Sequence, residues 1–131
     1  MRAIAFGLLA AVLSVQGVEA QPDTESANHL LPGCQMYLRT EQGRPLRSPF
    51  EVAMCLGLID GLTFVTETFA RFLPAFISSC PPGGVTKQQQ VRVVVAYIER
   101  RPERMHQPFN ILALEALHEA WPCPSNPAPP R

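Results

Sequence analysis

Apolar residues recur at helical spacing in the first part of the chain, between Thr24 and Leu38. This spacing puts them on one side of an α-helix and predicts an amphipathic first helix. Pro32 and Gly33 lie inside the segment, and we expect them to kink or interrupt the helix, because proline lacks a backbone donor. The residues on the predicted apolar side are Leu30, Leu31, Cys34, Tyr37 and Leu38.

A second helical segment has a clear start and is apolar on all sides. Ser48 supplies a capping hydroxyl, a proline follows at the first helical position, and Glu51 lies three residues after the cap, so that both side chains can satisfy free backbone donors. Between Phe50 and about Ile77, apolar residues occur all round the helical wheel. This pattern predicts a central helix that the other helices cover, with Pro74 kinking it or ending it a turn early.

Small and polar residues occur within this apolar stretch. Gly57 and Gly61 lie four residues apart, a spacing that lets another backbone approach closely. In a soluble chain this pair indicates close packing of a neighbouring helix, and a dimer face is the alternative. Asp60 and Thr63 lie in the same stretch. We expect Asp60 to reach an edge of the bundle or to accept local hydrogen bonds, because a buried carboxylate needs partners.

A third helix follows from start and stop signals. Cys80-Pro-Pro-Gly-Gly is expected to end the second helix, and Thr86 with Gln89 forms a capping box that begins the third. The third helix should stop near Arg101, because the proline that follows disfavours helical geometry in the residue before it. Its predicted buried stripe is Val91, Val94, Val95 and Ile98, flanked by Tyr97. Its predicted solvent-exposed side is Gln88, Gln90, Arg92 and Glu99.

The fourth helix is expected from Pro108 to about Trp121, after a short turn through His106. Pro122 should stop it, since proline cannot continue a helix without losing a hydrogen bond. Small residues in its apolar stripe allow close approach to a neighbour. That stripe is Phe109, Leu112, Ala113, Ala116, Leu117 and Ala120.

These four segments predict an all-α fold, a small antiparallel four-helix bundle with two disulfides. Four cysteines allow three pairings. In an up-and-down bundle, Cys34 and Cys55 lie at one pole while Cys80 and Cys123 lie at the other, which predicts the pairs 34 with 55 and 80 with 123. Loops of these lengths give each bridge roughly 3 to 4 kcal/mol in the chain-entropy model.

The N-terminal twenty residues have the pattern of a cleaved signal peptide. A basic start at Arg2 precedes a short apolar run, and Val18-Glu19-Ala20 fits the cleavage rule. The run is shorter than the roughly 20 residues that a bilayer requires, so we expect no membrane span. We predict a signal peptide over 1–20, a helical domain over 21–123 and a Pro-rich disordered tail over 124–131.

The net charge and the basic residues limit the kinds of partner that we expect. Without the signal peptide, the chain has ten basic and ten acidic residues, so we expect neither a nucleic acid nor an anionic membrane as a partner.

Arg39, Arg44 and Arg47 lie in a polar loop between the first two helices. This loop is the candidate contact surface for a protein partner, and a solvated connector is the alternative.

No catalytic set is present in the sequence. His29, His106 and His118 are spread along the chain, and His118 with Glu115 supplies too few ligands for zinc. The patterns of redox, haem, metalloprotease and hydrolase sites do not occur. We therefore expect solvated surface histidines, no enzyme activity, no metal and no cofactor, in a protein that works by binding.

The order of motifs in the second half of the chain resembles the Rap1a/Tai family of immunity proteins. The resemblance spans Cys55 to Cys123, with departures at Leu58 and Trp121 that change packing. The motifs that carry it are Cys55-Leu-Gly-Leu-Ile-Asp-Gly61, Cys80-Pro-Pro-Gly-Gly-Val-Thr86, Arg101-Pro-Glu-Arg-Met-His106 and Ala116-Leu-His-Glu-Ala-Trp-Pro-Cys123.

This resemblance implies a small helical, disulfide-bonded periplasmic protein. Its implied partner is a cognate amidase toxin, a peptidoglycan amidase delivered by type VI secretion, which it would inhibit by occluding the active site. A homodimer is a further partnership that the glycine pair allows. Two other classes stay open: a general periplasmic stress or chaperone-like binding protein of unknown partner, and a carrier that holds an apolar ligand in the bundle interior.

Overall fold

The computed structural model describes residues 23–124, which form four α-helices and two short 3-10 turns. No strand occurs within this range beyond two isolated bridges. The predicted all-α fold with four helices and two disulfides is confirmed. The predicted signal peptide and all but the first residue of the predicted tail lie outside the described residues. The elements are α1 (Ala27–Thr40), α2 (Pro49–Thr68), η1 (Ala75–Ile77), α3 (Lys87–Glu99), η2 (Pro102–Arg104) and α4 (Phe109–Ala120).

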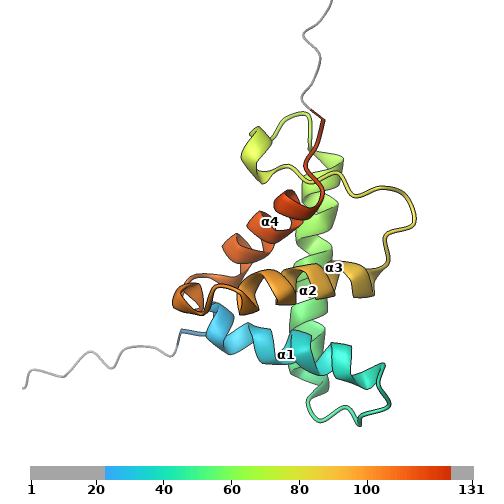
Figure 1. Ribbon diagram of the computed structural model, residues 1–131, viewed down its shortest axis with the longest axis vertical. Coiled ribbons are helices and arrows are strands. Elements are labelled where there is room, and N and C mark those ends of the chain that lie inside the picture. Colours follow the sequence, from blue (N-terminus) through green and yellow to red (C-terminus); the bar gives the residue numbers. More distant parts are fainter. Residues whose placement is uncertain (1–22, 125–131) are drawn as a thin grey trace, which may run out of the picture.

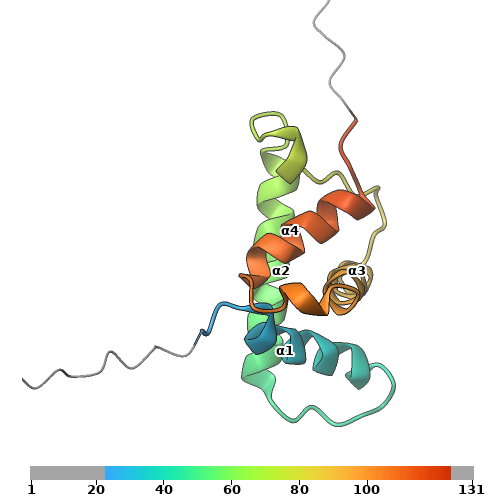
Figure 2. The same ribbon diagram turned by 60° about the vertical axis from the view of Figure 1, so that its left-hand side comes forward.

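The helices cross one another instead of aligning along a common axis. Figure 1 shows α1 and α3 lying across the long axis of α2, with α4 running obliquely beside it. Figure 2 shows α1, α3 and α4 grouped to one side of α2. The expected antiparallel alignment is therefore not confirmed. The core lies where the four helices cross, and its largest fully buried apolar side chains are Ile59, Val91, Val94, Ile98, Phe109, Leu112 and Leu117.

Helix α1 is continuous, so Pro32 and Gly33 do not interrupt it, which was one of the two expected effects. Pro32 has no N–H to donate to the carbonyl of Asn28, four residues earlier. Both residues are exposed, so this carbonyl can accept a hydrogen bond from water instead. Gly33 has a different role: a Cβ there would collide with the backbone carbonyl of Glu51 in α2. This direct backbone contact brings the cysteine that follows Gly33 next to Cys55, and the two form a disulfide with a Cα–Cα distance of 5.3 Å.

Helix α2 begins where predicted and ends earlier than predicted. The Ser48 hydroxyl accepts a hydrogen bond from the backbone N–H of Glu51 at 3.5 Å. The helix ends at Thr68 and does not reach Ile77, because Pro74 lacks a donor and would clash with the carbonyl four residues earlier. The chain turns there, and the Ser78 hydroxyl donates to the carbonyl of Ala70 at 3.3 Å.

The Cys80-Pro-Pro-Gly-Gly motif consequently lies beyond the end of α2 and does not terminate it. Cys80 donates its backbone N–H to the carbonyl of Trp121 at 2.8 Å. It forms the second disulfide with Cys123, where the Cα–Cα distance is 4.8 Å. Gly84 has φ +93°, a left-handed conformation that glycine adopts without a steric penalty. The motif is thus bonded to the residues that directly follow α4, and it turns the chain toward α3.

The start signals and buried stripes of α3 and α4 largely match the prediction. Both halves of the capping box are present: Thr86 donates its N–H to the Gln89 side chain at 2.8 Å and accepts from the Gln89 N–H at 3.2 Å. Two residues differ from the predicted pattern of buried and exposed positions. Gln90 is buried because it flanks Val94 on the helical wheel. Ala120 is exposed, since the last residue of α4 lies past the core.

Candidate functional site

The outer face of α2 exposes large apolar side chains, so the prediction that other helices cover α2 on all sides is wrong. Its buried residues, such as Cys55 and Ile59, share one side of the helix. The other helices pack only against that side (Figure 2). The exposed large apolar residues of α2 and the turn after it are Phe50, Met54, Phe64, Val65, Phe69, Phe72 and Phe76.

Gly57 and Gly61 lie on this exposed face. Nothing lies within 4 Å of a Cβ built at either position. The interpretation that they admit a neighbouring helix of the same molecule is therefore wrong, and Gly33 provides that close contact instead. By length and hydropathy alone α2 could cross a bilayer, although core helices and signal sequences meet the same two criteria.

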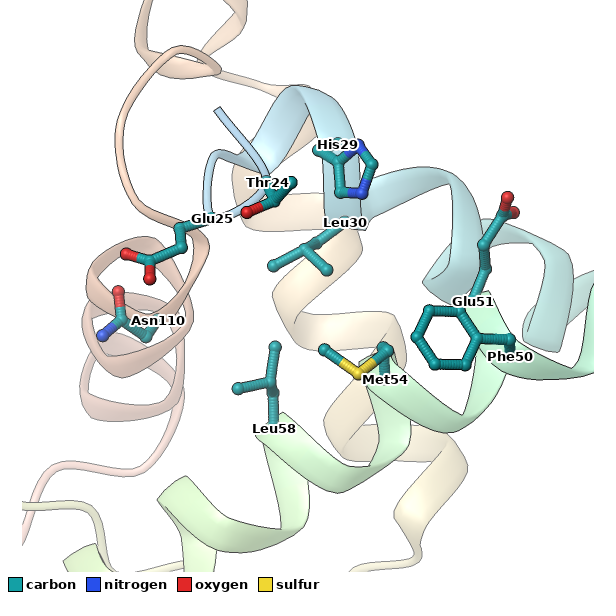
Figure 3. Close-up of a pocket in the computed structure, with 9 residues that line it drawn as sticks. All are labelled: Thr24, Glu25, His29, Leu30, Phe50, Glu51, Met54, Leu58 and Asn110. Atoms are coloured by element: carbon teal, nitrogen blue, oxygen red, sulfur yellow. The ribbon is translucent and has the colours of Figure 1, made fainter. Parts of the chain in front are cut away.

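A hollow of about 490 Å³ lies between α1, the outer side of α2 and the start of α4. Figure 3 shows Leu30, Met54 and Leu58 pointing into it and Phe50 closing one side. Its polar lining residues are Thr24, Glu25, His29, Glu51 and Asn110. The shape and lining suit an apolar side chain of a partner, with hydrogen-bonding groups around it. Phe50 and Met54 belong to both the hollow and the outer face of α2, so the two surfaces are continuous.

The structure brings the three predicted contact residues together. Arg39, Arg44 and Arg47 surround a smaller hollow of about 230 Å³ with Met36 and Pro45. All three arginines are exposed. None of them forms an ion pair with an acidic residue between positions 23 and 124. Arg39 lies in the last turn of α1 and not in the loop where it was predicted. The end of α1 and the loop after it therefore present three guanidinium groups to solvent beside a small apolar depression.

An ionic cluster that sequence reasoning missed joins η2, α3 and α4. The Arg104 guanidinium donates to both carboxylate oxygens of Glu115, at 2.6 and 2.9 Å. The Tyr97 hydroxyl donates to the same carboxylate at 2.7 Å, and the Arg101 guanidinium lies 3.7 Å from the centre of the Tyr97 ring. All four side chains have partners within the cluster, which indicates a structural role.

The pKa values in this cluster follow from its contacts. The hydrogen bond from Arg104 lowers the pKa of Glu115 and outweighs the opposing effect of burial. Burial, followed by the nearby Glu115 carboxylate, raises the pKa of Tyr97. The hydrogen bond to Glu115 also raises the pKa of Arg104. The ionised carboxylate and the neutral phenol are therefore the favoured forms in the folded protein.

The remaining polar candidates have structural surroundings. His118 is half-buried, with Nδ1 2.7 Å from the carbonyl oxygen of Ser78, so it is not the solvated histidine that was expected. His29 and His106 are exposed. Asp60 reaches the surface and pairs with Lys87. Within residues 23–124, no three histidine, cysteine or acidic side chains are grouped so that they could hold a metal ion.

A model of the Rap1a immunity protein family matches residues 26–123, from the residue before α1 to the last cysteine. The chain belongs to the Rap1a immunity protein family. No curated protein and no solved structure matches it. In this Rap1a family member the match includes all four helices and both disulfides.

The motifs that carry the Rap1a resemblance divide into two groups. The segments from Cys80 to Thr86, from Arg101 to His106 and from Ala116 to Cys123 supply the second disulfide, η2 and the two arginines of the ionic cluster. The segment from Cys55 to Gly61 supplies part of the core and part of the exposed face of α2. Arg39, Arg44 and Arg47 lie within the matched range and outside these motifs.

Proposed function

We propose that this Rap1a family member is an exported immunity protein that binds a peptidoglycan amidase effector and occludes its active site. The observation that carries the proposal is the family match over residues 26–123. Two disulfides support an oxidising compartment, and the first twenty residues have the pattern of a signal peptide. The periplasm meets both conditions and contains the peptidoglycan on which a type VI amidase effector would act.

The loop of Arg39, Arg44 and Arg47 is the proposed contact surface for the effector. Arginine is favoured at protein interfaces because its planar guanidinium donates several hydrogen bonds in a fixed geometry. Arg39 lies in the last turn of α1, the other two arginines lie between α1 and α2, and the Cys34–Cys55 disulfide joins these two helices. This anchoring supports a preorganised surface that would receive carboxylates of the effector.

The most direct test of this function combines genetics with capture. Cells that lack the protein should be lysed by siblings that deliver the effector, and the disulfide-intact protein should capture an amidase from a periplasmic extract. If loss of the protein does not sensitise cells, and no amidase is captured, the immunity function is wrong.

Charge reversal tests the contact surface separately. We expect the double variant Arg44→Glu with Arg47→Glu to weaken effector binding at least about tenfold. The variant replaces two cations with carboxylates, which would repel the carboxylates of the effector. Arg71→Glu is the matched control, since Arg71 is also exposed and forms no ion pair among residues 23–124. Equal effects of the two changes would exclude the loop as the contact surface.

A periplasmic chaperone-like function is the second candidate. The exposed phenylalanines of α2 favour it, because unfolded client proteins are bound through apolar surfaces. A chaperone would suppress aggregation of unrelated unfolded proteins and would bind no particular amidase. An immunity protein would bind one effector and leave such aggregation unchanged.

A further inference from the structure

We propose that the hollow between Arg39, Arg44 and Arg47 is an anion site that binds a phosphate group. This inference concerns a ligand of the protein by itself and does not rest on the proposed immunity function. Three observations carry it. The three guanidinium groups line one small hollow, no acidic side chain of residues 23–124 lines that hollow, and backbone contacts hold the three arginines in place.

The hollow concentrates positive charge that no ion pair in the described part of the chain neutralises. Its volume is about 230 Å³, and its other lining residues, Met36 and Pro45, are uncharged. The three guanidinium groups form no ion pair among residues 23–124. Glu41, the acidic residue of the loop, pairs instead with Arg92 of α3 at 3.5 Å. An anion in the hollow would therefore reduce the repulsion between three like charges.

Backbone contacts hold both ends of the loop against the last turns of α1. The N–H of Arg44 donates to the carbonyl of Arg39 at 3.3 Å, which keeps these two residues next to each other. At the other end of the loop, the Ser48 N–H donates to the sulfur of Met36 at 3.3 Å. Arg47 directly precedes Ser48 and is therefore brought to the same part of α1. Because the arginine backbones are held in this way, less conformational entropy is lost when an anion binds.

The number and shape of the donors favour a phosphate group over a single carboxylate. A guanidinium group is planar and donates two parallel hydrogen bonds to a pair of oxygens. One arginine is therefore enough for a carboxylate, which has one pair of oxygens and one negative charge. A phosphate monoester carries a charge of about −1.5 to −2 at neutral pH, and its oxygens point in tetrahedral directions. Three guanidinium groups around one hollow can therefore bind different oxygens of the same phosphate group.

A titration of the mature, disulfide-intact protein with sodium phosphate tests the site. NMR of the arginine side chains would follow it at low ionic strength, because salt screens exposed charges. We expect the Nε–H signals of Arg39, Arg44 and Arg47 to shift together, with a dissociation constant of about 1 mM or lower. The signal of Arg71, which lies between α2 and η1 at the opposite end of α2 (Figure 1), should not shift. Equally tight binding of sodium acetate would overturn the preference for phosphate.

Two double variants distinguish the guanidinium groups from positive charge alone. Arg44→Gln with Arg47→Gln removes two of the three cations and should raise the dissociation constant for phosphate at least about tenfold. Arg44→Lys with Arg47→Lys keeps the charge without the planar group and should give an intermediate constant. Both positions are exposed, so circular dichroism should show an unchanged helical fold. Arg71→Gln is the control, because it removes an exposed arginine elsewhere and should leave phosphate binding unchanged.

Vesicles form a second arm of the experiment, because a lipid headgroup can supply the same phosphate chemistry. Cosedimentation with vesicles that contain phosphatidylglycerol would be compared with cosedimentation with phosphatidylcholine alone. Binding of inorganic phosphate without binding of vesicles assigns the site to free phosphate. Binding of phosphatidylglycerol vesicles that Arg44→Gln with Arg47→Gln abolishes assigns it to a headgroup.

Two results would overturn the phosphate site. One is the absence of saturable binding to both inorganic phosphate and phosphatidylglycerol vesicles. The other is phosphate binding that Arg44→Gln with Arg47→Gln leaves unchanged, because the anion would then be bound elsewhere. None of these measurements contains an effector, so a failure of the phosphate site is distinguishable from a failure of the proposed immunity function.

Discussion

The α3–α4 pair and the outer face of α2 both contain large aromatic side chains, which are buried in the first region and exposed in the second. Phe109 and Tyr97 are buried between helices, and the ionic cluster of Arg104 and Glu115 joins the pair at its edge. Phe50 and Phe64 on α2 are mostly exposed. This difference indicates that the first region stabilises the fold of one copy, and that the second is available for contacts between molecules.

Truncating one phenylalanine in each region should give the largest contrast. Phe109 is fully buried, so Phe109→Ala should lower the free energy of unfolding by about 3 to 5 kcal/mol through lost burial and a residual cavity. Phe64→Ala should change the stability of the monomer by less than about 0.5 kcal/mol. Urea denaturation at low protein concentration measures both, and similar losses in the two variants would contradict the division into two regions.

The glycines provide the next test, with effects of opposite sign. A Cβ at Gly33 would collide with the Glu51 carbonyl, so Gly33→Ala should force α1 away from α2 and destabilise the protein by about 1 to 3 kcal/mol. Gly57→Ala meets open space and should stabilise the monomer by about 0.5 to 1 kcal/mol, because alanine favours helix. Thermal unfolding compares the two variants, and destabilisation by Gly57→Ala would show that α2 packs differently from this description.

The ionic cluster should produce the smallest effect, visible in the dependence of stability on pH. Because the pKa of Glu115 is lowered in the folded protein, its stabilising contribution is present above the ordinary glutamate pKa and is lost as pH falls through the lowered value. Glu115→Gln should therefore reduce the loss of stability on acidification. Urea denaturation at a series of acidic pH values measures this slope, and an unchanged slope would exclude Glu115 as a contributor.

Tyr97 gives the alkaline counterpart of the same test. Its pKa is raised, so its contribution is present below the ordinary tyrosine pKa and is lost as pH rises through the raised value. Tyr97→Phe should remove that alkaline loss. An alkaline loss that persists in the variant would assign it to another group.

Sequence patterns predicted the helices best where polar residues mark the outer side. In α3, the polar residues between Val91, Val94 and Ile98 separate a wet side from a buried stripe, and the structure has that stripe. In α2, apolar residues occur on all sides, so periodicity does not say which side the other helices cover. The covered side is decided by tertiary contacts, above all the backbone contact at Gly33.

The candidate surfaces were predictable to different degrees. Arg39, Arg44 and Arg47 are recognisable in the sequence as basic residues between two helical patterns, and the structure groups them around one hollow. The pairing of Arg104 with Glu115 was not predictable, because it depends on how η2 turns the chain between α3 and α4. The hollow between Leu30 and Leu58 likewise depends on how α1 and α2 cross.

The central claim is that this Rap1a family member inhibits an amidase effector, and one measurement tests it most directly. The amidase that the disulfide-intact protein captures from a periplasmic extract would be assayed on purified peptidoglycan with increasing amounts of that protein. We predict that hydrolysis stops at a stoichiometric amount of the protein, and that Arg44→Glu with Arg47→Glu shifts inhibition to higher concentration. Full hydrolysis in the presence of excess wild-type protein would contradict the claim.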